Sequence, residues 1–434
     1  MSGINNSSNE YKRQGERIRS NPLNIPENMR ITTIIFVVLI TCCFNTAAQK
    51  RIYIPEDLQG MNLESDTSKW CWKRSAETRD CIFMWERGFG NDLQNPPRLE
   101  GQPMDFNLSV LMDRVQSFYT FFRDTLQFVK GDSKANHYKM MVMVKYSLDG
   151  TAYGGTYDNF IGALWVAPNR IQDKTMNCMA HELGHSFQTQ IVADSMGEAW
   201  GGCGFFEMTS QWMLWQVNPW WLRDENDHFE AFKTLTHKAY LAKENIYHSP
   251  YVIQWWSDLH GRASIAELYR QGRLGEDPVI TYKRMYGLSQ SDFNAEMLRG
   301  YQHLINFDFT HARRETRAYA CTFTCKLDTL GGGWLQPENM PEEYGFNAIP
   351  LPVGKKRVRV ELKGDNVLFG FVGVTSEGES LYGDVGNPVF TCPKGKELKH
   401  LYLVVMGAPS EHKQLQAEDG NGTTATFPYK FRVR

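Results

Sequence analysis

The spacing of apolar residues predicts helices and strands mixed along the first part of the chain. From Phe106 to Val129 apolar side chains recur at intervals of three and four, which predicts an amphipathic helix. Short apolar runs at Cys81–Trp85, Met140–Tyr146 and Ile161–Ala167 predict strands. Residues 150–158 are rich in Gly and Tyr, and we interpret them as a loop.

A further helix is predicted from about Thr175 to Ala193. Its buried stripe consists of apolar residues that recur every four positions: Met179, Leu183, Phe187 and Ile191. A glycine-rich break at residues 201–204 separates it from another helical pattern, Phe205–Val217. The chain then stays mainly helical to about Phe307.

After about His311 the apolar period changes to that of strands. Charged and apolar residues alternate from Arg357 to Leu362 and again from Phe427 to Arg434. Two apolar runs lie between them, at Val367–Val374 and Leu401–Met406, and glycine and proline separate all of these segments. The pattern indicates an antiparallel β-sandwich or jelly-roll-like module.

The N-terminus carries an export pattern. Residues 31–44 form an apolar or small-residue run that is short for a membrane span, preceded by Arg30 and followed by small residues up to Ala48. We therefore expect a signal peptide that is cleaved after Ala48, and an exported protein. An uncleaved membrane anchor is the alternative.

Export changes how the cysteines are interpreted. Seven of them follow Ala48, and an oxidising compartment favours disulfides. Cys71 with Cys81 would close a short loop, and Cys178 with Cys203 would tether two neighbouring helices. For the second pair, two buried thiols are the alternative.

Charge and composition narrow the partners. The 434 residues carry 47 Lys and Arg against 49 Asp and Glu, a formal net charge of −2, so no global basic field indicates nucleic acid or an anionic membrane as the main partner. Aromatic residues make up 13% of the chain, which suits stacking on sugars but is explained more simply by core packing.

The strongest chemical signal is an HExxH motif, His181-Glu182-Leu183-Gly184-His185. Residues four apart share one face of a helix, so the two imidazoles could hold one ion on the side opposite Leu183, facing a cleft. Glu182 would then act as general base on a zinc-activated water. We expect the strand Ile161–Ala167 to lie at the sheet edge beside this helix. Two surface histidines, or a metal site without catalysis, are the alternatives.

Zinc requires a third protein ligand, and a downstream carboxylate can supply it. The candidates are Asp194, Glu198 and Glu207. Glu207 opens a predicted helix amid apolar residues, where an isolated carboxylate is unfavourable unless a metal or a partner compensates for its burial. We therefore favour Glu207, with Glu198 as the alternative. No oxyanion-stabilising residue can be selected among six downstream side chains: His228, His237, His248, His260, Tyr240 and Tyr247.

The residues His181 to Gln188, followed 22 residues after His185 by Glu207 in a predicted helix, resemble a known group. They resemble the gluzincin metallopeptidases, and among these the enhancin-like, mucin-directed group with its pattern HExGHxxQ and a downstream Glu. The chain also looks like an uncharacterised family of secreted HExxH proteins that end in a β module, although Ser210 stands where that family has Ala. The resemblance implies zinc as the cofactor and, for the second family, no proven substrate.

Together the patterns predict an α+β protein in three parts. Residues 1–48 are the N-terminal extension and signal peptide. Residues 49–312 form a zincin-like metallohydrolase domain, with a small mixed sheet and a helical lower half. Residues 313–434 form the β-sandwich or jelly-roll-like module.

The expected function is that of a secreted zinc-dependent hydrolase, foremost a metallopeptidase that cleaves proteins or glycoproteins. Glu182 is its general base, and the zinc ligands are His181, His185 and Glu207. The alternatives are a zinc enzyme that hydrolyses a glycan or an ester, and a non-catalytic zinc protein that binds carbohydrate. Nucleic acid is not expected as a partner, nor is a membrane beyond the export signal.

Overall fold

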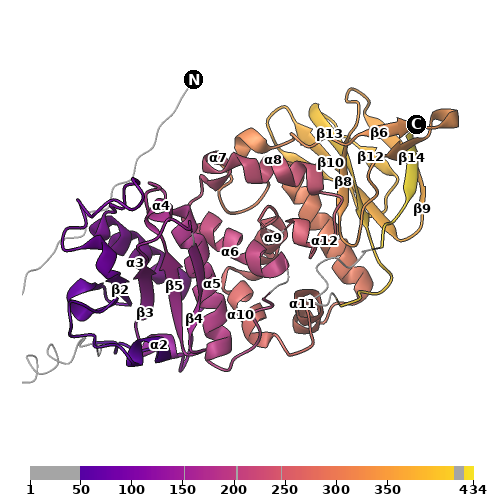
Figure 1. The fold of residues 1–434 in the computed structure, drawn as a ribbon. Coiled ribbons are helices and arrows are strands. Elements are labelled where there is room, and N and C mark those ends of the chain that lie inside the picture. Colours follow the sequence, from indigo (N-terminus) through magenta and orange to yellow (C-terminus); the bar gives the residue numbers. More distant parts are fainter. Residues whose placement is uncertain (1–48, 151, 202–203, 246, 415–424) are drawn as a thin grey trace, which may run out of the picture. The chain divides into compact units, whose positions relative to one another are not determined.

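A computed structural model describes residues 49–150, 152–201, 204–245, 247–414 and 425–434. The fold is α+β: a mixed sheet comes first, helices follow, and two antiparallel sheets end the chain (Figure 1). The predicted signal peptide and its cleavage site lie outside the described residues. Within the described ranges, the structure has no helix that is both long and apolar enough to cross a membrane.

The first sheet combines parallel and antiparallel strands. Its order is β1-β2-β3-β5-β4, with β1 (Ser75–Glu77), β2 (Cys81–Trp85), β3 (Met140–Val144), β4 (Ala152–Tyr157) and β5 (Ile161–Val166). The three central strands β2, β3 and β5 are parallel, and β1 and β4 run antiparallel at the two edges. The central strands are almost entirely buried, which explains why they appear in the sequence as continuous apolar runs.

The prediction for the sheet edge was wrong. β5 lies inside the sheet, and β4, which falls in the predicted loop, forms the edge. Two glycines in the middle of β4 conceal its strand pattern. Gly154 is required there by close packing, because a Cβ at this position would lie 1.7 Å from the carbonyl oxygen of Glu182 on the neighbouring helix.

Three predicted helices are present with shifted ends: α3 (Leu108–Asp124), α5 (Asn177–Ala193) and α6 (Gly204–Val217). The predicted stripe of α5 is fully buried. The opposite face of α5 is covered as well, because α6 packs across it, so the helix is buried almost all round. The helical part continues with α7 (Trp221–Asp224), α8 (Asn226–Leu235), α9 (Tyr251–His260), α10 (Ala263–Gln271), α11 (Pro278–Tyr286) and α12 (Gln290–Ile305).

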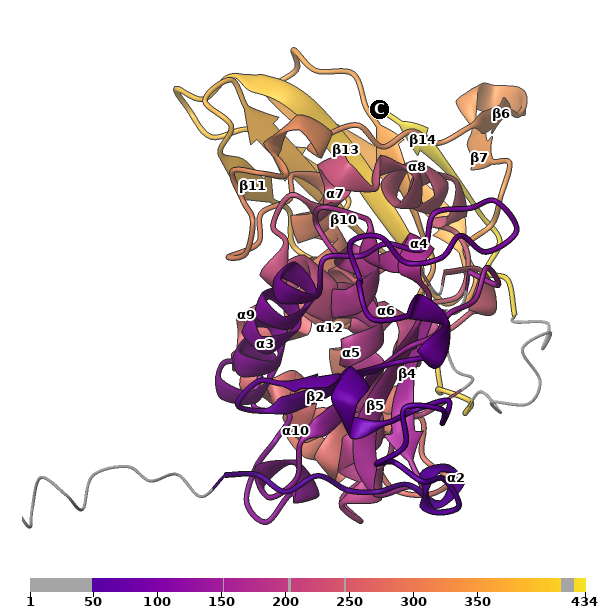
Figure 2. The same cartoon turned by 60° about the vertical axis from the view of Figure 1, so that its left-hand side comes forward.

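Two antiparallel sheets follow the helices (Figures 1 and 2). The four-stranded sheet has the order β11-β10-β13-β8, with β8 (Phe346–Pro350), β10 (Val367–Thr375), β11 (Ser380–Tyr382) and β13 (Leu398–Gly407). The five-stranded sheet has the order β12-β9-β14-β7-β6, with β6 (Leu327–Thr329), β7 (Leu335–Pro337), β9 (Arg357–Gly364), β12 (Val389–Thr391) and β14 (Tyr429–Val433).

Strand β13 belongs to two hydrophobic clusters at once. Tyr402, Val404 and Met406 join the large core that also contains residues of α12. The alternate residues Leu401, Leu403 and Val405 join a second cluster with residues of β9 and β14. The four-stranded sheet is therefore covered on both faces, by helix α12 on one and by the five-stranded sheet on the other.

The predicted disulfide between Cys71 and Cys81 does not form. Both residues are fully buried free thiols, which pack as small apolar side chains. The six described cysteines form no disulfide with one another. The predicted pairing of Cys178 depends on Cys203, which lies outside the described residues.

Candidate metal centre

The candidate centre lies where α5 and α6 pack against each other. His181, Glu182 and His185 are on α5, and Glu207 is in the first turn of α6. The helices can approach closely because Gly184 has no side chain: a Cβ there would lie 2.5 Å from the Ser210 hydroxyl oxygen. That hydroxyl donates a hydrogen bond to the carbonyl oxygen of His181, which fixes the two helices in this register.

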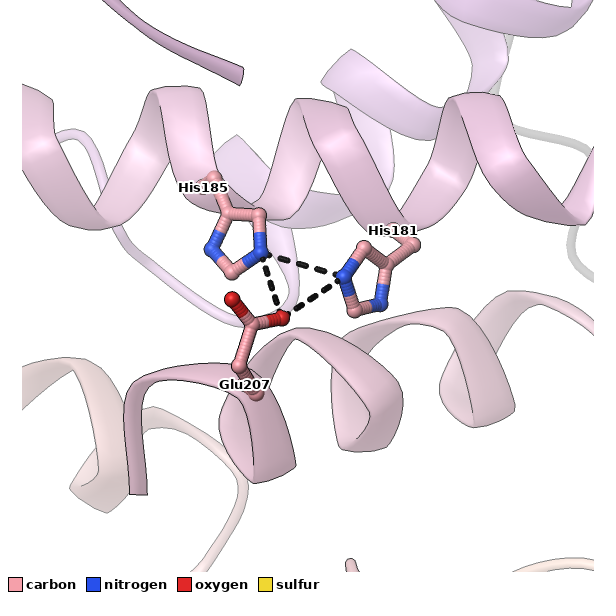
Figure 3. Close-up of side chains that lie close together, drawn as sticks. All are labelled: His181, His185 and Glu207. Atoms are coloured by element: carbon pink, nitrogen blue, oxygen red, sulfur yellow. Dashed lines mark hydrogen bonds and ion pairs between the residues drawn. The ribbon is translucent and has the colours of Figure 1, made fainter. Parts of the chain in front are cut away.

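Three potential ligand atoms converge at this contact (Figure 3). The Nε2 atoms of His181 and His185 are 3.0 Å apart, and Oε2 of Glu207 is 3.1 Å from the first and 3.0 Å from the second. In the described part of the chain these residues form the one group of metal-ligating side chains whose ligand atoms all lie within 4.8 Å of one another. Tetrahedral zinc with bonds of about 2.0–2.1 Å separates its ligand atoms by about 3.3 Å, so the three atoms fit such an ion.

The outer nitrogen of each histidine is held by a glutamine. Nδ1 of His181 lies 2.7 Å from Oε1 of Gln211, and Nδ1 of His185 lies 2.7 Å from Oε1 of Gln188. The glutamine amides are themselves oriented, because their NH₂ groups donate to the backbone carbonyls of Tyr247 and Phe206, which can only accept. Both Nδ1 atoms must therefore donate to the glutamine oxygens.

This network decides what the centre can bind. A neutral imidazole that carries its proton on Nδ1 presents a lone pair at Nε2. Two such lone pairs and a carboxylate oxygen meet within 3.1 Å of one another, so three acceptors converge without a donor. The chemistry of this set of atoms calls for a cation, and a divalent metal satisfies all three at once.

Burial strengthens this requirement. His181 and His185 are only 8% and 4% exposed. Burial raises the pKa of Glu207, but hydrogen bonds and charge from His181 and His185, when these are protonated, outweigh that effect and lower it to about 2; a bound cation would take the place of those protons. The carboxylate is therefore ionised at neutral pH, as a metal ligand must be.

Glu182 lies beside the three ligand atoms and does not belong to their group. Together with His181 it lines a cleft of about 350 Å³. Burial raises the pKa of Glu182 to about 7, although the charge of His181, when it is protonated, and a 2.8 Å hydrogen bond from the backbone N–H of Gly154 act in the opposite direction. A carboxylate with this pKa can both accept and release a proton near neutral pH.

The other two carboxylates considered as ligands do not reach the centre. Oε1 of Glu198 accepts the backbone N–H of Ala199 at 2.9 Å, and Oδ1 of Asp194 accepts the backbone N–H of Lys134 at 2.9 Å. Both side chains therefore stabilise local backbone, and Glu207 is the carboxylate that the fold brings to the histidines.

Neither glutamine was assigned a role from the sequence, although Gln188 is the last residue of the pattern HExGHxxQ. Gln188 follows His185 by three positions and Gln211 follows Glu207 by four, spacings that place each pair on one helix face. That spacing was a usable signal, but polar residues at such positions are common on exposed helices. Their nearly complete burial, which only the structure shows, distinguishes them.

We expect Gln188→Leu to weaken the binding of a divalent metal, with zinc as the probe, by about 10- to 100-fold, because the orientation and tautomer of His185 lose their support. Competition with a chromogenic chelator measures this affinity. Gln190→Leu is the matched control: Gln190 is equally buried on the same helix but contacts Phe160, Gly162 and Asp194 instead of the centre. Equal losses in the two variants would contradict the role of Gln188.

Two adjacent glycines of β4 provide a second comparison. Gly154→Ala should destabilise the protein by about 1–3 kcal/mol, since its methyl group would collide with the backbone of Glu182. Gly155→Ala should have a much smaller effect, because the nearest atom to its Cβ is 3.8 Å away, on Trp165. Urea unfolding of both variants measures the difference, and equal stabilities would argue against the tight contact of β4 with α5.

No curated protein matches the chain. Among solved structures, the ZmpB metallopeptidase from Clostridium perfringens is similar at 14% identity over 88% of this chain and 72% of that chain, with a TM-score of 0.33. A likeness at this level carries no argument about activity. The model of a family of unknown function (DUF6055) matches residues 44–434, and the chain therefore belongs to that family.

Proposed function

We propose that the protein is an exported zinc-dependent hydrolase, foremost a metallopeptidase that cleaves proteins or glycoproteins. Its zinc ligands are His181, His185 and Glu207, and its general base is Glu182. The observation that carries this proposal is the convergence of three ligand atoms, Nε2 of His181, Nε2 of His185 and Oε2 of Glu207, with the Nδ1 atoms of both histidines turned outward to glutamine oxygens.

The proposal extends to the architecture. We assign residues 49–312 to a zincin-like catalytic domain, in which the helix with the HExxH motif packs on a mixed sheet with an antiparallel edge strand. Residues 313–434 are assigned to a β-sandwich. The shared burial of the two C-terminal sheets supports the second assignment.

The chain's own residues supply the proton transfers. Zinc bound at this centre would lower the pKa of a water molecule to about 7 and polarise a substrate carbonyl. Glu182, the carboxylate beside the ligand atoms, takes the proton from the attacking water and delivers it to the leaving group. The N–H of Gly154 donates to one oxygen of Glu182 and so orients the other oxygen for this exchange.

Tyr247 is our candidate for stabilising the oxyanion. Of the six side chains that the sequence left open, Tyr247 and His228 line the cleft beside Glu182. The ring of Tyr247 lies 5.9 Å from that of His181, and burial raises its pKa, so the hydroxyl stays protonated and able to donate.

Tyr247→Phe should lower kcat by about 10²- to 10³-fold, the usual effect of removing one oxyanion donor, and leave the zinc content unchanged. Steady-state kinetics measure this loss. Tyr153→Phe, at a similarly exposed tyrosine on β4, should change kcat little. A Tyr247→Phe enzyme with wild-type kcat would remove Tyr247 from the mechanism.

The function itself is tested by metal analysis and a substrate panel. Purified protein should contain one zinc ion per chain by mass spectrometry of the metal, and should release peptides from glycoproteins in a reaction that chelators abolish and zinc restores. Release of sugar or acid without release of peptides would favour a zinc enzyme that hydrolyses a glycan or an ester. Stoichiometric zinc without any turnover would favour a binding protein, and absence of zinc after reconstitution would overturn the metal centre.

A further inference from the structure

The outer face of the five-stranded sheet carries an unusual set of positive charges. Its strands lie on the side of the four-stranded sheet away from α12 (Figure 1). Alternate residues of β9 and β14 point away from the second hydrophobic cluster, and on this face most of them are basic. We call this set the basic face; it consists of Arg357, Arg359, Lys363, Lys430, Arg432 and Arg434.

The charges are placed where they repel one another. Lys363 and Lys430 are direct partners in the register of β9 and β14, and like charges in such cross-strand positions destabilise a sheet. Glu361 is the acidic residue among them, and it is already engaged with Arg432 at 2.6 Å and Arg434 at 2.8 Å. Among the described residues, the ion pairs of this face join Glu361 to Arg432 and Arg434, so the charges of Arg357, Arg359, Lys363 and Lys430 are not neutralised by a carboxylate.

An indole ring lies in the middle of these cations. Three of them surround the half-buried Trp334, which immediately precedes β7: the charged groups of Lys363, Lys430 and Arg432 are 5.1, 5.3 and 4.6 Å from its ring centroid. The contacts hold the long side chains close to the sheet. The result is an ordered array that combines positive charge with an aromatic surface.

A cleft adjoins the basic face. A cleft of about 520 Å³ is lined by Arg359, Glu361 and Arg434 together with the apolar side chains of Leu362 and Phe369. Its volume lies in the range of sites that accept small organic groups. The cleft thus adjoins the basic face, with polar walls from that face and apolar walls from side chains that pack against the second hydrophobic cluster.

We propose that the basic face binds a linear acidic polysaccharide, one that carries carboxylate or sulfate groups along its length. On β9, Arg357, Arg359 and Lys363 span about 20 Å, with alternate residues about 6.7 Å apart, and Arg432 of β14 lies opposite the acidic position Glu361. This arrangement suits a polymer that carries anions along its length. Guanidinium groups pair in a bidentate manner with carboxylate and sulfate oxygens. The indole of Trp334 and the cleft offer apolar contacts to sugar rings.

Other polyanions fit the observations less well. The whole chain has a net charge of −2, whereas nucleic-acid-binding proteins usually have a strongly basic field. Insertion into a membrane needs exposed apolar side chains. In the described part of this sheet the large exposed apolar residue is Val433, which alternates with Arg432 and so points to the opposite face.

Binding of the full-length protein to defined polymers tests the proposal. Polygalacturonate and dextran sulfate should bind, neutral dextran should not, and the affinity should fall as salt is added. Lys363→Glu should weaken binding by about tenfold or more, because it removes one cation and pairs with a second, Lys430. Because the new glutamate would lie opposite Lys430 across the two strands, the substitution should not destabilise the sheet. Lys399→Glu, an equal charge change at an exposed position of β13, is the matched control and should have less than a twofold effect.

Two outcomes of the binding experiment would contradict the proposal. Binding that is equally weakened by both charge reversals, or unaffected by either, would overturn the assignment of the basic face. Tighter binding to single-stranded DNA or to vesicles with phosphatidylserine than to both acidic polymers would overturn the assignment of its ligand. The proposal does not depend on the metal centre, so the Glu207→Gln protein should bind the polymers as the wild type does.

Discussion

Glu182→Gln is expected to lower kcat/KM by about 10³-fold or more while the purified protein retains its zinc. General acid–base catalysis contributes about 10²–10⁴-fold, and the amide can neither accept the proton of the attacking water nor return it to the leaving group. Glutamine has nearly the same shape, and its amide oxygen can still accept the hydrogen bond from the N–H of Gly154. The loss should therefore arise from chemistry and not from misfolding.

Metal content and thermal unfolding, measured on the same preparation, separate these causes. Wild-type zinc and an unchanged melting temperature with loss of peptide release would support Glu182 as the general base. A variant with full zinc and at least a tenth of the wild-type activity would exclude that role. Loss of zinc together with activity would show instead that Glu182 supports the metal site.

Glu207→Gln is expected to have the largest effect on the metal itself. The amide replaces a charged oxygen that lies 3.0–3.1 Å from both histidine nitrogens. The site keeps two neutral nitrogens and loses the one negative charge among the proposed ligands, so we expect zinc affinity to fall by about 10²-fold or more. Chelator competition measures this loss.

The matched control for Glu207→Gln is Glu198→Gln, since Glu198 was the other favoured candidate for the third ligand. Its carboxylate accepts local backbone N–H groups, so this variant should keep wild-type zinc affinity. Chelation should lower the melting temperature of the wild type and of Glu198→Gln, because a ligand that binds the folded state stabilises it. A Glu198→Gln variant that loses zinc while Glu207→Gln keeps it would reverse the assignment.

Local sequence patterns were sufficient to predict the buried face of α5 and the approach of Glu207 to the histidines. The stripe of α5 could be identified because one face of the helix repeats apolar residues every four positions. Glu207 could be selected because a carboxylate amid apolar residues requires compensation for its burial. The structure brings its oxygen to both histidine nitrogens.

The features that depend on packing between distant segments could not be predicted from the sequence. The edge strand β4 was missed because Gly154 and Gly155 interrupt its alternation, and their purpose, close contact with α5, involves residues almost thirty positions away. Gln211 on α6 reaches His181 on α5, and Gln188, which contacts His185 on its own helix, is oriented by the carbonyl of Phe206 on α6, so both roles depend on how the two helices face each other. Sequence spacing within one helix does not contain that information.

Because both faces of β13 are buried, the helical part and the C-terminal sheets depend on each other. One set of its side chains completes the helical core and the alternate set completes the core between the sheets. Removing either neighbour would expose a continuous apolar surface to water. The C-terminal sheets could therefore not easily be exchanged between proteins as an independent module, unlike domains that are joined by linkers. Substitutions on the two sides of β13 should be selected together.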